Sequence, residues 1–219
     1  MFGSFDFAIL WANAPFLWNG MLLTQRLTGL AVAGGLVLGT VLAVARLSPI
    51  KPLAWVVAAY VNFLRSMPLI LVIFWFYTLV PKLIGRPVSG FYSVLIAFVM
   101  FEAAYYSEIV RAGISSVRRG QISAAMALGL TKMQSMRYVI LPQAVRNMVP
   151  VLLTQSIVML QDTSLVYVVG LRDFLTSADI VASRDNRPTE LYLFVALVFL
   201  VICFSASRLA NRLQRKYAL

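Results

Sequence analysis

Three charged side chains stand inside long apolar stretches of this sequence of 219 residues: Arg65, Glu102 and Asp162. Counted at about 1.5 Å per helical residue from the ends of these stretches, all three fall near the middle of a membrane. A charge at that depth is costly, and it is usually paired or lines a functional cavity. The sequence therefore predicts either a buried ion pair, in which Arg65 binds Glu102 or Asp162, or a polar solute path lined by all three residues.

The composition limits other kinds of chemistry. The sequence has no histidine and one cysteine, Cys203, which excludes histidine-based catalysis, the usual zinc sites and a disulfide within the chain. It has no phosphate-binding loop of the Walker A type, so the chain is not expected to hydrolyse ATP. We therefore expect no catalytic residue, no metal site and no cofactor in this chain.

The elements that must position the charged residues are apolar helices. Hydrophobic residues make up 61% of the sequence and the mean hydropathy is +0.84, whereas soluble domains contain roughly 45–50% apolar residues. About 20 apolar residues suffice for a helix to cross the hydrocarbon core. The sequence therefore predicts an all-α membrane protein with five transmembrane helices, at residues 20–45, 53–80, 91–110, 149–170 and 191–210.

The segments beside these helices predict simpler structures. Residues 1–19 carry many aromatic side chains and are expected to lie flat at the membrane interface. Pro68 predicts a kink in the second helix. Residues 171–188 are polar and predict a short helix, and residues 214–219 form a tail.

Basic residues are divided unequally between two sets of loops. The loops at 46–51, 111–146 and 208–216 hold twelve basic residues and no acidic one, whereas the opposite set holds five of each. Cytoplasmic loops of membrane proteins are enriched in Lys and Arg, so the N-terminus is predicted outside and the C-terminus in the cytoplasm. The same asymmetry explains the net charge of +11, so no nucleic-acid partner is expected.

Small residues recur every four positions in the first predicted helix, at Ala31, Gly35, Gly39 and Ala43. This spacing places them on one helical stripe, where the lack of side-chain bulk lets another helix approach closely. We expect the stripe to pack against a second helix, either within the chain or across a dimer.

The longest basic stretch runs from residue 108 to residue 144. Within it, residues 121–128 are rich in alanine and predict a short helix that Gly129 ends. A second amphipathic segment is predicted to stop at Pro142, because proline cannot continue a helix interior. Glu108 is expected to pair with Arg111, its helical neighbour three residues on. A small helix held between basic segments is suited to dock on a cytosolic partner.

This stretch resembles the EAA loop of ABC-importer permeases, which holds the coupling helix that sits in a groove of the ATPase subunit. The matching residues are Gly-Gln at 120–121, Ala-Ala at 124–125, Ala-Leu-Gly-Leu at 127–130 and Ile-Leu-Pro-Gln-Ala at 140–144. Ser123 stands where the family usually has glutamate. Within a coupling loop at about 111–148, the resemblance implies ATPase contacts from Gly120, Gln121, Ser123, Ala124, Ala125, Leu128 and Gly129.

Other segments are similar to the polar amino-acid uptake branch of these permeases. Residues 63–68, Phe-Leu-Arg-Ser-Met-Pro, resemble its Phe-Arg-Gly-Thr-Pro segment, and Asp-Thr-Ser-Leu at 162–165 matches as well. The sequence looks most like the glutamate/aspartate permeases. The resemblance implies a type I importer permease domain over residues 20–213, which would move its solute by alternating access across the bacterial cytoplasmic (inner) membrane.

The resemblance also implies partners. A dimer of ABC ATPase subunits, which carries ATP and Mg²⁺, would bind the cytoplasmic loops. A second permease subunit, either identical or a paralogue, would complete the path. A periplasmic or lipid-anchored solute-binding protein would deliver the solute, and membrane lipid would surround the helices.

Two other classes of function stay open. A secondary transporter driven by an ion gradient could use Glu102 and Asp162 as carriers, although the sequence has no visible inverted repeat. A membrane scaffold or integral-membrane enzyme is the other class, and no nucleophile or metal constellation supports it. Among importers, a basic or other polar amino acid is the alternative solute.

Overall fold

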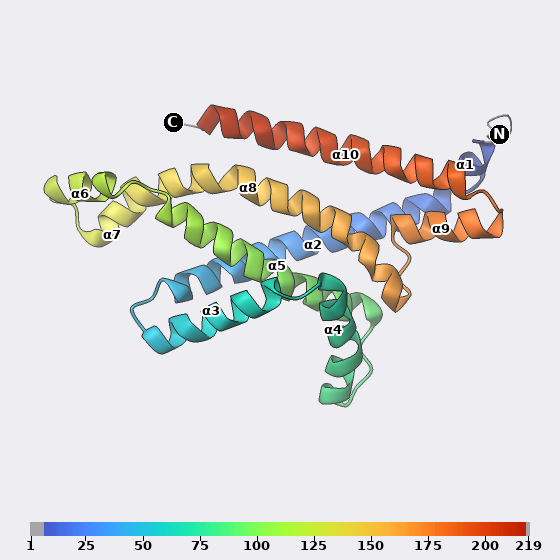
Figure 1. The fold of residues 1–219 in the computed structure, drawn as a ribbon, viewed down its shortest axis with the longest axis horizontal. Helices are drawn as coiled ribbons and strands as arrows, with labels where there is room; N and C mark the ends of the chain where they lie inside the picture. Colours follow the sequence, from blue (N-terminus) through green and yellow to red (C-terminus); the bar gives the residue numbers. More distant parts are fainter. Residues whose placement is uncertain (1–6, 218–219) are drawn as a thin grey trace.

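The computed structural model of the chain describes residues 7–217, most of which are helical. Figure 1 shows an elongated bundle with α6 and α7 at one tip and α1 and α9 at the other. In chain order the helices are α1 (Ala8–Ala12), α2 (Ala14–Arg46), α3 (Lys51–Arg65), α4 (Leu69–Ile84), α5 (Gly90–Ser115), α6 (Arg119–Ala127), α7 (Lys132–Ser135), the π-helical η1 (Met136–Ile140), α8 (Leu141–Asp162), the 3-10 helix η2 (Thr163–Val169), α9 (Phe174–Arg184) and α10 (Pro188–Tyr217).

Four described helical segments are long and apolar enough to cross a membrane: 14–46, 90–115, 132–169 and 188–215. The predicted second span is instead a pair of helices, α3 and α4, bent by 107°. In Figure 1, α4 turns away from the long axis of the bundle. Pro68 explains the break, because its ring removes an amide donor and disfavours helical geometry at the residue before it. The fold thus has four straight candidate spans, or five if the bent pair is one span.

Close packing of α2 against α5 forms the largest helix contact of the fold. The predicted small-residue stripe lies at this contact, and Ala31, Gly35, Gly39 and Ala43 are all buried there.

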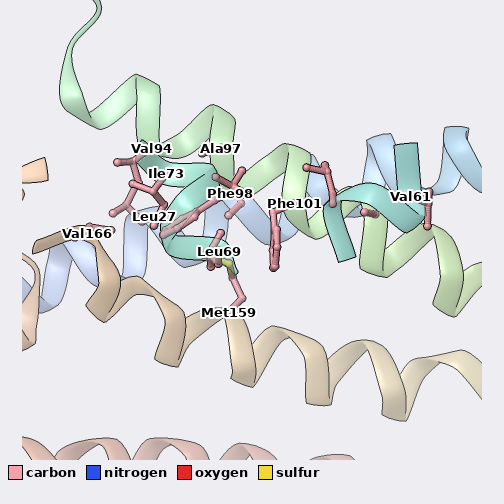
Figure 2. Packing of buried hydrophobic residues seen from close by; sticks show 14 of the residues in the cluster. Leu27, Val61, Leu69, Ile73, Val94, Ala97, Phe98, Phe101, Met159 and Val166 are labelled. Carbon is pink, nitrogen blue, oxygen red and sulfur yellow. The ribbon is translucent and has the colours of Figure 1, made fainter. Parts of the chain in front are cut away.

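The largest apolar core lies where α4 and α5 meet α2 and α8. Figure 2 shows Leu69 and Ile73 of α4 beside Phe98 of α5, with Leu27 of α2 and Met159 of α8 completing the cluster. Because the first turn of α4 is buried in this core, the break before it is held in place by packing as well as by Pro68.

The predicted helix end at Pro142 is wrong. The chain stays helical from Lys132 to Val169, and Pro142 lies in the first turn of α8, directly after the π-helical turn η1. A proline is tolerated in a first turn, where an amide donor is not needed, and a π-helical turn shifts the local hydrogen-bond pattern. One continuous helical segment therefore connects the α6–α7 tip to the opposite half of the bundle.

The predicted short helix in residues 171–188 is present as α9. Asp173 begins it as a buried N-cap, whose carboxylate accepts hydrogen bonds from the amides of Leu175 (3.2 Å) and Thr176 (3.0 Å). The amide of Phe174 donates to the hydroxyl of Thr24 at 3.1 Å, which ties α9 to α2. Of the predicted interfacial segment, residues 14–19 belong to α2 and residues 1–6 lie outside the described range.

Candidate functional site

The tip of the bundle formed by α6 presents apolar side chains to the surroundings. Leu128, directly after the last residue of α6, is 83% exposed, and Met126 is 48% exposed. In Figure 1 this tip lies at the end of the bundle toward which α10 runs. Two exposed apolar side chains on a short helix form a knob of the kind that fits a groove on another protein.

Gly129 closes α6 with the left-handed turn that the sequence predicted. Its φ angle is 82°, where a Cβ is strained. The amide of Leu130 donates to the carbonyl of Ala125 at 3.1 Å, and the amide of Gly129 donates to that of Met126 at 3.0 Å. This pair of bonds is the Schellman arrangement of a glycine-ended helix.

A capping box fixes the start of the next helix. The hydroxyl of Thr131 accepts from the amide of Gln134 at 3.2 Å, and the Gln134 side chain accepts from the amide of Thr131 at 2.8 Å. The turn between α6 and α7 is thus held on both sides. This turn joins α6 to α7, which begins the continuous helical segment that includes α8.

The predicted docking residues divide into two groups. Ala125 is only 3% exposed, so its methyl group packs inside the chain and is not available for the predicted direct contact with an ATPase. The physical reason is helical rotation of about 100° per residue, which turns Ala125 inward while its neighbour Ala124 faces out. The exposed members are Gly120, Gln121, Ser123, Ala124, Leu128 and Gly129.

The charged residues predicted at mid-membrane lie in different environments. Glu102 is fully buried, and its Oε1 accepts a hydrogen bond of 3.1 Å from the side-chain amide of Gln155 on α8. Its Oε2 has no hydrogen-bond partner among the described residues. Asp162 is partly buried at the last residue of α8. Glu102 therefore lies in the contact between α5 and α8, and Asp162 lies at the start of η2.

Arg65 does not form the predicted pair with Glu102 or Asp162. Its Nη1 lies 4.0 Å from Oε2 of Glu108, and its guanidinium carbon lies 5.5 Å from the ring centroid of Tyr105. Counting residues along single helices gives the depth of each charge but not how neighbouring helices pack. α3 packs against α5 so that Arg65 lies beside Glu108, which is six residues, about 9 Å, along α5 from Glu102.

Glu108 is the centre of a cluster that sequence reasoning found only in part. The predicted pair with Arg111 is confirmed. Arg46, the last residue of α2, also binds Glu108, with an Nη1–Oε2 distance of 2.5 Å. The sequence places Arg46 and Arg65 near the ends of two helices. It does not show that both contact Glu108, because that depends on how the helices pack.

A cavity of about 310 Å³ opens between α5 and α8 next to this cluster. Glu108 and Ala112 of α5 line it on one side, and Val151 of α8 lines it on the other. Ser116 and Asn147 also line it, and the Asn147 side chain donates to the Ser116 hydroxyl at 2.9 Å. The Glu108 carboxylate and the hydrogen-bonded pair of Ser116 and Asn147 thus line the same cavity.

Comparisons with known proteins agree on one kind of protein. Residues 35–219 match the family described as the binding-protein-dependent transport system inner membrane component. The glutamate/aspartate import permease protein GltK of Escherichia coli O6:H1 is 49% identical over 98% of this chain and 99% of the relative. The probable glutamine ABC transporter permease protein GlnM of Bacillus subtilis is 36% identical over 95% of this chain and 96% of the relative.

Solved structures extend the similarity to the fold. A chain from the crystal structure of an amino acid ABC transporter with histidines has a TM-score of 0.90 and 34% identity, and the match covers 97% of this chain and 99% of that one. A chain of the MetNI methionine ABC transporter has a TM-score of 0.78 at 20% identity, covering 98% of this chain and 100% of that one. The second match bears on the fold alone.

Proposed function

Because this chain belongs to the family of inner membrane components of binding-protein-dependent transport systems, we propose that it is the permease subunit through which an ATP-driven importer moves glutamate and aspartate. The assignment of the solute rests on the identity of 49% with a glutamate/aspartate import permease over nearly the whole of both chains. Family membership leaves the ion-gradient alternative without support. Glutamine, named for the relative at 36% identity, is the second candidate solute.

Membership of the family supports three kinds of partner. An ATPase subunit, which holds ATP and Mg²⁺, docks on α6 through Leu128 and Met126, the exposed apolar side chains of the knob. A solute-binding protein delivers the amino acid at the opposite side of the membrane. A second permease subunit, identical or paralogous, supplies the other half of the path.

Coupling uses the continuity of the chain behind the docking knob. ATP binding brings the two ATPase subunits together and moves the α6 knobs with them. The fixed turn at Gly129 and Thr131 passes that motion to the helical segment from Lys132 to Val169, which contains Asp162. Movement of this segment against α5 alternates the access of the path between the two sides of the membrane.

The proposed orientation has the N-terminus outside and the C-terminus in the cytoplasm, with α3 and α4 together counted as one of five spans. The charge asymmetry of the loops supports it, since the set that includes the α6 segment holds twelve basic and no acidic residues. The fold also supports it, because α6 and the end of α10 lie toward one end of the bundle and α1 and α9 toward the other (Figure 1).

A single substitution tests the docking assignment. Leu128→Arg places a charge on the knob without disturbing the interior of the chain, so the variant should insert in the membrane normally and fail to retain the ATPase during purification. Ser183→Arg adds the same charge on an exposed position of α9, at the other end of the bundle, and should retain it. Equal recovery of the ATPase with both variants would refute docking at this knob.

A further inference from the structure

Three guanidinium groups share one carboxylate at the inner end of the bundle. Arg46 of α2, Arg65 of α3 and Arg111 of α5 all form ion pairs with Glu108. In the part of the chain that the structure describes, no second carboxylate lies within ion-pair distance of these arginines. The cluster therefore carries two positive charges in excess.

Partial burial makes this excess costly. The side chains of Arg46 and Glu108 are only 20% and 22% exposed, near the end of a helix that is apolar enough to span a membrane. Charges in such surroundings are usually paired, because desolvation of an unpaired charge is expensive. An anion that reached the cluster would relieve the excess.

Arg65 is the member best placed to bind that anion. Its Nη1 lies 4.0 Å from the Glu108 carboxylate, against 2.5 Å for Arg46, and its side chain is 38% exposed. It makes no hydrogen bond to any residue within 7–217, although a guanidinium has five N–H donors. One face is taken by the Tyr105 ring, which leaves the N–H edge free for a planar carboxylate.

Space for a small molecule lies beside the same carboxylate. Glu108, but none of the three arginines, lines the cavity of about 310 Å³ between α5 and α8, and this volume is at the lower end of the range of roughly 300–1,000 Å³ seen for small-molecule sites. The cavity lies toward the end of α5 that leads to α6, so in the proposed orientation it is on the cytoplasmic side.

We infer that the cluster formed by Arg46, Arg65, Glu108 and Arg111 is a transient site for the carboxylate of an amino-acid solute near the cytoplasmic end of its path. Arg65 binds the carboxylate, and Glu108 faces the ammonium group of the same solute. Because Glu108 also competes for the arginines, the site holds the solute weakly and releases it. This inference rests on the proposed function, since it takes the solute to be an amino acid.

The test uses the complete complex, purified with its ATPase, second permease and binding protein, in vesicles of phosphatidylcholine alone. Arg65→Gln keeps hydrogen-bond donors but removes the charge, Arg65→Lys keeps the charge, and Arg26→Gln is the matched control at an exposed arginine of α2 outside the cluster. The measurements are the maximal rate of labelled glutamate uptake, the rate of ATP hydrolysis and the unfolding temperature of the complex. A parallel set of vesicles contains added phosphatidylglycerol.

The expected result is that Arg65→Gln lowers the uptake rate roughly tenfold, as loss of a charged hydrogen bond would do, while ATP hydrolysis and unfolding temperature stay as in the parent. Arg65→Lys should recover part of the rate, and Arg26→Gln should match the parent. Equal rates for Arg65→Gln and Arg26→Gln would overturn the inference and leave the proposed function intact. A loss seen only with phosphatidylglycerol would assign the arginines to a lipid headgroup instead.

Two further outcomes would also overturn the inference. A lower unfolding temperature for Arg65→Gln, without recovery of uptake in Arg65→Lys, would make Arg65 a structural residue. If the parent complex took up no amino acid at all, the proposed function and this inference would both fall.

Discussion

Gly39 of α2 lies directly on the backbone of α5, where a Cβ at Gly39 would come within 2.9 Å of the carbonyl oxygen of Ala103. The same Cβ would lie 3.0 Å from the amide nitrogen of Ser107. Backbone atoms cannot move aside as the end of a flexible side chain can, so the approach of these two helices depends on the absence of a side chain at Gly39.

The first prediction is that Gly39→Ala destabilises the permease by about 1–3 kcal/mol, as overpacking of an interior does. Gly29→Ala is the matched control in the same helix, because a Cβ there meets nothing within 4 Å. The control should be neutral or slightly stabilising, since alanine favours a helix over glycine by about 1 kcal/mol. Thermal unfolding of the purified complex in detergent measures both, and equal unfolding temperatures would contradict the contact.

The second prediction concerns coupling through Gly129. Gly129→Val places a β-branched residue at φ 82°, a strain of roughly 1 kcal/mol or more, and should uncouple ATP hydrolysis from uptake because the turn behind α6 no longer holds its shape. Gly129→Asn should behave nearly as the parent, since asparagine tolerates this conformation. The measurement is the number of solutes moved per ATP hydrolysed. The turn has no role in coupling if the Val variant keeps the ratio of the parent.

The third prediction compares the loss of stability when Glu108 is replaced with the loss when Arg65 is replaced. Glu108→Leu removes the one carboxylate that three arginines share, and should lower stability by up to about 3 kcal/mol. Arg65→Met should cost less than about 1 kcal/mol, because Arg65 is partly exposed and its ion pair is long. Folded yield on size-exclusion chromatography ranks the two variants. A lower folded yield for Arg65→Met than for Glu108→Leu would instead support the buried ion pair at Arg65 that the sequence predicted.

The fourth prediction is a pH dependence at Asp173, outside the membrane spans. Burial raises the pKa of its carboxyl above the ordinary value of 3.8. The folded state therefore keeps the proton to a higher pH than the unfolded chain, and the stability that Asp173 contributes falls as the pH rises through its folded pKa.

Two substitutions isolate this effect. Asp173→Asn can still accept hydrogen bonds from the amides at the start of α9 but has no charge to bury, so its stability relative to the parent should rise as the pH rises above the ordinary carboxyl pKa of 3.8. Asp173→Ala loses the cap and should be less stable than Asp173→Asn by about 1 kcal/mol. Unfolding temperatures of parent and variants across this pH range give the comparison. A difference between Asn variant and parent that did not change with pH would rule out the buried charge.

Local sequence signals predicted the local features of the fold. Gly129 ends α6 because a residue without a Cβ adopts its φ angle without strain, and Pro68 breaks the second span because of its ring. Both effects act within a few residues, so one sequence is enough to find them. The pairing of Glu108 with Arg111 belongs to the same group, since helical spacing alone brings the two together.

Features that depend on packing between distant segments were not predictable in this way. Arg65 contacts Glu108 and not Glu102 because of how α3 packs along α5, which the spacing of charges in the sequence does not determine. Ala125 faces the interior because the chain that follows α6 folds back toward it, and Pro142 continues a helix because a π-helical turn precedes it. Each outcome follows from tertiary structure overriding a local preference.

The most direct measurement is uptake of labelled glutamate into proteoliposomes that hold the complete complex, with all ion gradients collapsed by ionophores. Uptake should require both ATP and the solute-binding protein, and excess unlabelled aspartate should suppress it while excess glutamine should not. Uptake that proceeds without ATP when an ion gradient is restored would contradict the central claim of an ATP-driven permease. ATP-dependent uptake suppressed by glutamine and not by aspartate would contradict the assigned solute.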